Sequence, residues 1–172
     1  DLKSPKLSKG PDRFLNIVLD MNKNKKNLEV VLTGKRRQFL IENFNKNKIK
    51  YHYFEMIDFH TLNELYNLLD LYIVASRVEG GPRSLFECAI SRTPIISTDV
   101  GFASNILSHK SIFSGENYKK AIPDTDYSRN IVILRLVLLT FLIECAGRTS
   151  NPIKSYNFVT LKLLIVPTGR TV

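Results

Sequence analysis

Four short runs of strand-forming residues alternate along the chain with four stretches of helical character. The runs are rich in Val, Ile, Leu and Tyr, and two of them are almost wholly apolar, as strands covered on both faces are. Strands that alternate with helices in this way form right-handed βαβ units around a parallel sheet. We therefore predict an α/β fold, with strands at residues 28–33, 49–54, 71–75 and 94–98 and helices at residues 11–21, 37–45, 61–69 and 83–91.

Local signals mark the beginnings of two of these helices. Pro11 suits the first turn of the first helix, because an amide hydrogen is not needed there. Thr61 and Glu64 have the spacing of a capping box, in which each side chain accepts a hydrogen bond from the other residue's amide. We therefore expect Thr61 to be the N-cap of the third helix.

Both ends of the chain depart from the α/β pattern. Residues 1–10 are mostly charged and polar, so we expect the first strand of the sheet, which normally lies at its centre, to be missing. The neighbouring strands would then lack a partner, and residues 161–167 are a candidate to fill the gap. Residues 129–172 hold 6 basic residues and 1 acidic residue. We therefore divide the chain into a domain at residues 1–128 and an atypical apolar and basic tail at 129–172, for which foreign or frameshifted sequence is one hypothesis.

Charge and reactive residues exclude several classes of protein. The net charge of +9 suits an anionic partner. The basic clusters at residues 23–26 and 35–37 lack interleaved aromatic residues, so we interpret them as solvated faces and expect no nucleic-acid partner. The 2 Cys and 3 His do not have the spacing of a disulfide framework or a metal site. We therefore expect a reducing, cytoplasmic compartment and no metal.

The most informative segment joins the third predicted strand to the fourth predicted helix. It contains Gly80 and Gly81, which allow close approach of a ligand, and Pro82, which begins the helix. Backbone N–H groups at a helix N-terminus bind anions, and open α/β sheets bind ligands beyond the carboxyl ends of their strands. This turn is therefore a candidate phosphate site.

Two carboxylates, Glu79 and Glu87, bracket the same turn with seven residues between them. A carboxylate can accept two hydrogen bonds from the hydroxyl groups of a sugar, so the turn has the chemistry to recognise a nucleotide sugar. The alternative is an ordinary strand-to-helix turn in which the acidic residues only favour the helix N-terminus. The spacing alone does not choose between these interpretations.

Several motifs in order resemble the C-terminal, nucleotide-sugar-binding domain of retaining family 4 glycosyltransferases. The resemblance covers residues 8–127, and its motifs are Lys9-Gly10-Pro11-Asp12, residues 62–76, Glu79-Gly80-Gly81-Pro82, Ser84-Leu85, Glu87-Cys88-Ala89 and residues 93–101. It implies a GT-B fold, which consists of two Rossmann-like domains. The sequence is thereby identified as a Rossmann-like parallel sheet flanked by helices and as a fragment of a longer enzyme.

The resemblance also assigns roles to individual residues. It implies that Glu79 contacts the donor sugar and that Lys9 neutralises the diphosphate, which makes these two the catalytic candidates. It implies that Glu87 binds the ribose. The donor-binding loop that it implies comprises Gly80, Gly81, Ser84 and Leu85. Residues 54–57 are a candidate for stacking on the nucleobase.

The function that the resemblance implies is transfer of a sugar from a nucleotide diphosphate to an acceptor hydroxyl with retention at the anomeric carbon. It implies that this reaction belongs to surface polysaccharide or glycolipid synthesis and takes place at a membrane-peripheral location. It also implies that the reaction needs no cofactor. The acceptor would be held by an N-terminal domain that this chain lacks, so we expect the chain alone to be inactive. Two alternatives stay open, a nucleotide-sugar epimerase or hydrolase with a related domain and a non-catalytic anion-binding fragment.

Overall fold

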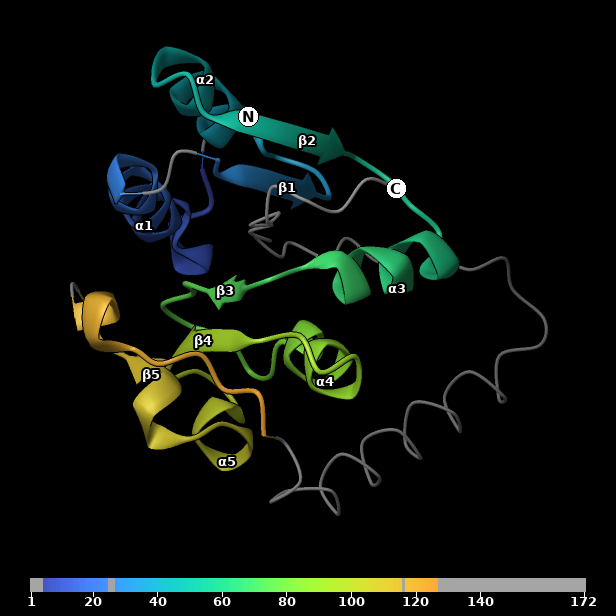
Figure 1. Cartoon of the computed structure of the whole chain (residues 1–172), viewed down its shortest axis with the longest axis vertical. Helices are drawn as coiled ribbons and strands as arrows, with labels where there is room; N and C mark the ends of the chain where they lie inside the picture. The colour runs from blue at the N-terminus through green and yellow to red at the C-terminus, as the bar shows by residue number, and fades with distance from the viewer. Residues whose placement is uncertain (1–4, 25–26, 116, 127–172) are drawn as a thin grey trace.

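The computed structural model describes residues 5–24, 27–115 and 117–126, which form one α/β unit (Figure 1). Its elements, in chain order, are η1 (Leu7–Lys9), α1 (Pro11–Asn24), β1 (Glu29–Thr33), α2 (Gln38–Lys46), β2 (Lys50–Phe54), α3 (Phe59–Leu68), β3 (Tyr72–Val74), α4 (Arg83–Ile90), β4 (Ile95–Thr98), α5 (Ala103–Ile106), η2 (His109–Ser111), β5 (Ile112–Phe113) and η3 (Asn117–Lys120). All four predicted strands and all four predicted helices are present, which confirms the α/β class. Helix α5 and strand β5 were not predicted.

The strands form two parallel sheets. In one sheet β1 pairs with β2, and in the other the order is β3-β4-β5. In Figure 1, β1 of the first sheet lies next to β3 of the second sheet, and no hydrogen-bonded ladder joins these two strands among the described residues. The proposed substitute at residues 161–167, and the whole predicted tail at 129–172, lie outside the described residues.

Side chains alternate between two helix layers, as the two-residue period of a strand requires. Val30 and Leu32 of β1 join one apolar cluster, whereas Val31 joins the other. The first layer comprises α1, α2 and η3, and the second comprises α3, α4 and α5. Residues of β3 reach both layers, because Ile73 packs in the first cluster and Tyr72 in the second. The result is a three-layer arrangement, consistent with the expected Rossmann-like unit.

Two local predictions were wrong. The N-cap of α3 is Asp58 and not Thr61, because the Asp58 carboxylate accepts hydrogen bonds from the Thr61 amide at 2.8 Å and from its hydroxyl at 3.0 Å. The basic cluster at residues 35–37 is not wholly a solvated face. Arg37 is buried, and its Nε and Nη2 donate to the Thr33 carbonyl at 2.9 and 2.6 Å, where burial lowers its pKa to about 10.

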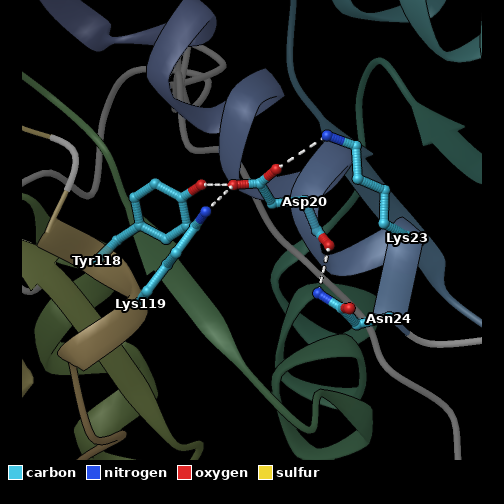
Figure 2. Close-up of polar contacts among 5 residues, drawn as sticks. All are labelled: Asp20, Lys23, Asn24, Tyr118 and Lys119. Atoms are coloured by element: carbon cyan, nitrogen blue, oxygen red, sulfur yellow. Dashed lines mark hydrogen bonds and ion pairs between the residues drawn. The ribbon is translucent and has the colours of Figure 1, made fainter.

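A group of polar contacts joins the last described helix to the first (Figure 2). The Asp20 carboxylate on α1 accepts a hydrogen bond from the Tyr118 hydroxyl and pairs with Lys119 of η3 at 2.9 Å. On its own helix, Asp20 pairs with Lys23 at 3.3 Å, and its carbonyl accepts from Asn24 at 3.1 Å. The Tyr118 hydroxyl is the main cause that holds the pKa of Asp20 far below its usual range, followed by the two lysines. These contacts tie η3 to α1 within the first layer.

None of the helices in the described part of the chain is long and apolar enough to cross a membrane.

Candidate functional site

The turn after β3 and the turn after β4 pack against each other through their glycines. Gly101 has a φ of +54°, and a Cβ there would lie 2.7 Å from both the backbone N and the Cα of Gly81. A Cβ on Gly81 would lie 3.1 Å from the Phe102 ring. Gly80, in contrast, has open space around it. The glycines therefore let two backbones meet at the carboxyl edge of the sheet, which positions the start of α4.

Helix α4 begins at this turn without a side-chain cap. Its N-cap is Pro82, which offers no capping oxygen. The backbone amides of Gly80 and Ser84 donate to no acceptor in the part of the chain that the structure describes. Unpaired amides and the positive end of the helix dipole both favour an anion at this point. The start of α4 therefore has backbone amides that are unpaired in the described residues and could bind an anion.

Lys9 and Glu79, the two catalytic candidates, are in contact. The Lys9 Nζ donates to the Glu79 Oε1 at 2.5 Å, and the Ser76 hydroxyl donates to the Glu79 Oε2 at 2.8 Å. Their side chains are only 21% and 18% exposed, so the pair is partly shielded from water. This cluster of Lys9, Glu79 and Ser76 places one cation and one carboxylate beside the glycine turn.

A second set of contacts holds Lys9 in place. Gly10 has a φ of +63°, and a Cβ there would lie 1.9 Å from the Ala75 carbonyl oxygen, so the chain passes directly over the end of β3. The amide of Arg77 donates to the Ser8 carbonyl at 2.8 Å, and its guanidinium forms two hydrogen bonds with Asp12 at 2.7 and 2.5 Å. The bond from Arg77 is the main cause that lowers the pKa of Asp12.

Glu87, the ribose-binding candidate, lies on α4 and contacts the second layer. The Tyr66 hydroxyl on α3 donates to the Glu87 Oε2 at 2.5 Å. Burial is the main cause that raises the pKa of Tyr72, and the charges of both Glu87 and Glu79 raise it further.

Ser84 and Leu85 do not present their side chains to this site. Leu85 is completely buried in the second layer, and its amide already donates to the Pro82 carbonyl at 2.9 Å. The Ser84 hydroxyl is buried without a hydrogen bond in the described chain, and it lies near the Tyr72 hydroxyl, whose pKa it lowers slightly. Of these two residues, only Ser84 offers a free group at the turn, and that group is its backbone amide.

Sequence reasoning missed four residues that position the candidates. No individual role was assigned from the sequence to Tyr66, Ser76, Arg77 or Gly101. Their contacts join segments that are far apart in the sequence, since Tyr66 and Glu87 are separated by 21 residues and Arg77 and Asp12 by 65. The one available signal was the set of motifs itself, which contains Tyr66, Ser76 and Gly101.

The remaining candidate, the stacking segment at residues 54–57, follows β2. Phe54 and Met56 are 38% and 61% exposed, so apolar surface is available there. The described residues contain no group of three or more His, Cys, Asp or Glu side chains arranged to hold a metal ion.

Two comparisons with known proteins bear on the family to which the chain belongs. The family model described as glycosyl transferases group 1 matches residues 4–124. No curated protein sequence matches the chain significantly. The matched segment contains the complete site, from Lys9 to Gly101, and it ends where the described structure ends its last bridge, at Asp124. The match spans well over half of the chain, and the chain therefore belongs to the glycosyl transferases group 1 family.

Proposed function

We propose that the described unit is the donor-binding half of a retaining, family 4 glycosyltransferase of the GT-B type. Its ligand is a nucleotide-diphosphate sugar, and its reaction passes the sugar to an acceptor hydroxyl in the synthesis of a surface polysaccharide or glycolipid. In this proposal a separate N-terminal domain holds the acceptor. The observation that carries the proposal is the contact of Lys9 with Glu79 beside the uncapped start of α4.

The diphosphate would lie at the glycine turn. The free amides of Gly80 and Ser84 and the dipole of α4 favour its negative charge, and Lys9 adds a full positive charge beside them. During transfer the bond between the anomeric carbon and the diphosphate oxygen breaks, and negative charge grows on that oxygen. Groups that are already oriented toward this charge stabilise the transition state more than the ground state. Lys9 therefore stabilises the negative charge of the departing diphosphate.

The two carboxylates would hold the two sugars of the donor. Glu79 is fixed by Lys9 and Ser76 near the diphosphate, so it is placed to accept hydrogen bonds from hydroxyl groups of the transferred sugar. Glu87 lies further along α4 and keeps one carboxylate oxygen, Oε1, without a partner among the described residues. That oxygen can accept hydrogen bonds from the ribose. The sugar is transferred to the acceptor oxygen, and the acceptor's proton leaves with the nucleoside diphosphate.

Calorimetric titration of the purified chain with UDP and with GDP tests this proposal. We expect one nucleotide to bind, and we expect Glu87→Gln and Lys9→Met each to weaken binding at least about tenfold, since each removes a charged hydrogen-bond partner. The matched control is Glu64→Gln, because Glu64 is a 60% exposed carboxylate on α3 outside the site. Failure of both nucleotides to bind a folded chain, or equal affinities in all variants, would contradict the proposal.

A further inference from the structure

Tyr66 makes a contact that its position in the core does not require. The side chain is only 4% exposed, yet its hydroxyl donates to the Glu87 Oε2 at 2.5 Å. Most buried tyrosine hydroxyls find a partner, but here the partner is a carboxylate whose second oxygen remains unpaired in the described chain. The contact thus uses one Glu87 oxygen and leaves the other available.

The surroundings of Tyr66 fix the position of its hydroxyl. Its ring packs edge-on against Tyr72 of β3, with 6.1 Å between ring centroids and 65° between ring planes. Its backbone carbonyl accepts a hydrogen bond at 2.7 Å from the hydroxyl of Thr93, which lies in the segment between α4 and β4. Tyr66 is therefore fixed by two contacts, one with Tyr72 of the sheet and one with Thr93, which follows the C-terminal end of α4. A phenol that is fixed in this way can fix the side chain to which it donates.

The phenol also keeps its proton under ordinary conditions. Burial is the main cause that raises the pKa of Tyr66 well above its usual value, and the nearby charge of Glu87 adds to the shift. Tyr66 therefore remains a hydrogen-bond donor at neutral pH. A glutamate side chain has three rotatable bonds, so a fixed donor at Oε2 selects one orientation for Oε1.

We propose that Tyr66 is a positioning residue for ribose recognition: its hydroxyl holds Glu87 in the one orientation in which Oε1 accepts hydrogen bonds from the ribose diol. This inference rests on the proposed function, because it assumes that Glu87 binds the ribose. It adds a residue that sets the preference of the site for ribose over deoxyribose. The ligand class that follows is a ribonucleoside diphosphate with both ribose hydroxyls free.

The test compares the affinities of UDP and GDP with those of their 2′,3′-dideoxy forms in the full chain. The ratio of the two dissociation constants measures ribose preference and is insensitive to a uniform loss of affinity. The variants are Tyr66→Phe, which removes only the hydroxyl, and Glu87→Gln. The matched control is Tyr72→Phe, which removes a buried hydroxyl that has no hydrogen-bond partner in the described structure from the ring that packs on Tyr66.

We expect Tyr66→Phe to lower the ribose preference about tenfold, as loss of one hydrogen bond to a charged group does, and Tyr72→Phe to preserve it. If Glu87→Gln loses the preference and Tyr66→Phe keeps it, the inference is overturned while the proposed function stands. An equal loss in Tyr72→Phe also overturns it, because the effect is then one of packing. A wild-type chain without any ribose preference overturns the proposed function and the inference together.

A measurement on the unsubstituted side chain complements the variants. The Tyr66 hydroxyl proton should give a slowly exchanging NMR resonance that is lost in Glu87→Gln and retained when UDP or GDP binds. Retention follows because the nucleotide engages Oε1 and leaves the Oε2 contact intact. A resonance that disappears on nucleotide binding would show that Tyr66 releases Glu87, and the positioning role would be wrong.

Discussion

The two helix layers use their polar groups in different ways. The first layer, of α1, α2 and η3, packs around an apolar cluster, and its best connected polar group, Asp20 of α1, contacts Tyr118 and Lys119 of η3 in the same layer (Figure 2). The second layer, of α3, α4 and α5, buries the hydroxyls of Tyr66, Tyr72 and Ser84 within its apolar cluster or beside it. Two of the three lie near the carboxylates of the candidate site.

This difference indicates that the two helix layers have different roles. Buried polar groups are costly unless they are paired, so they persist where they fix the orientation of another group. In the first layer such groups bond within the layer, as Tyr118 does to Asp20, or to β1, as Arg37 does. In the second layer Tyr66 instead bonds to Glu87, a carboxylate of the candidate site. Substitutions in the apolar cluster of the first layer should therefore change stability alone, whereas substitutions in the second layer should also change ligand recognition.

The largest expected effect comes from the apolar centre of the first layer. Phe44 is completely buried, so Phe44→Ala should lower the free energy of unfolding by about 3–5 kcal/mol through lost burial and the cavity that remains. Urea denaturation followed by circular dichroism measures it. Phe59, which is 50% exposed, provides the control, and Phe59→Ala should change stability by less than about 1 kcal/mol. A changed ribose preference in folded Phe44→Ala would break the distinction between the layers.

A smaller loss is expected at the junction of Lys9 with β3. Gly10→Ala should cost at least about 1–2 kcal/mol, because φ is positive there, and the overlap with the Ala75 carbonyl should displace the backbone that carries Lys9. Denaturation and nucleotide titration together measure both effects. The control is Gly80→Ala, whose Cβ meets open space and should leave stability within about 0.5 kcal/mol. Equal stabilities of the two variants would refute this account.

The ion pair of Asp12 with Arg77 should contribute less again. Its side chains are 39% and 34% exposed, and pairs of this kind are worth about 0.2–1 kcal/mol after screening by solvent. Asp12→Asn should therefore destabilise the chain slightly and weaken nucleotide binding, since Lys9 loses part of its support. A double-mutant cycle with Arg77→Met measures the coupling. Additive effects of the two substitutions would show that the pair does not act as a unit.

The smallest effect concerns pH and the contacts of Asp20 within the first layer. Because the pKa of folded Asp20 lies below its unfolded value of about 3.9, its contribution to stability is present above that pH and is lost as the pH falls further. Asp20→Asn should flatten the fall in melting temperature below about pH 4 and leave nucleotide binding at pH 7 unchanged. If the melting temperature of Asp20→Asn falls below pH 4 as steeply as that of the wild type, the contact of Asp20 with Tyr118 and Lys119 does not contribute to stability.

The sequence predicted this fold well because its signals are local. Hydrophobic period and turn residues placed every long element within a few residues of its observed ends. The errors arose where two local partners competed. The Asp58 carboxylate, three residues before Thr61, accepts from the Thr61 amide that the predicted capping box had assigned to Glu64. Arg37 folds back onto the Thr33 carbonyl instead of facing water. The sequence contained the observed partner in each case, and only the three-dimensional structure shows that it forms the hydrogen bond.

What the sequence determined by itself is the α/β class and the motifs that carry the glycines and carboxylates. What only the tertiary structure decided is which of these groups meet. Lys9 reaches Glu79 across 70 residues because Gly10 lets the chain cross the end of β3, and Tyr66 reaches Glu87 because α3 and α4 share one apolar layer. Periodicity depends on neighbours along the chain, whereas a hydrogen bond depends on a distance and an angle that packing alone provides.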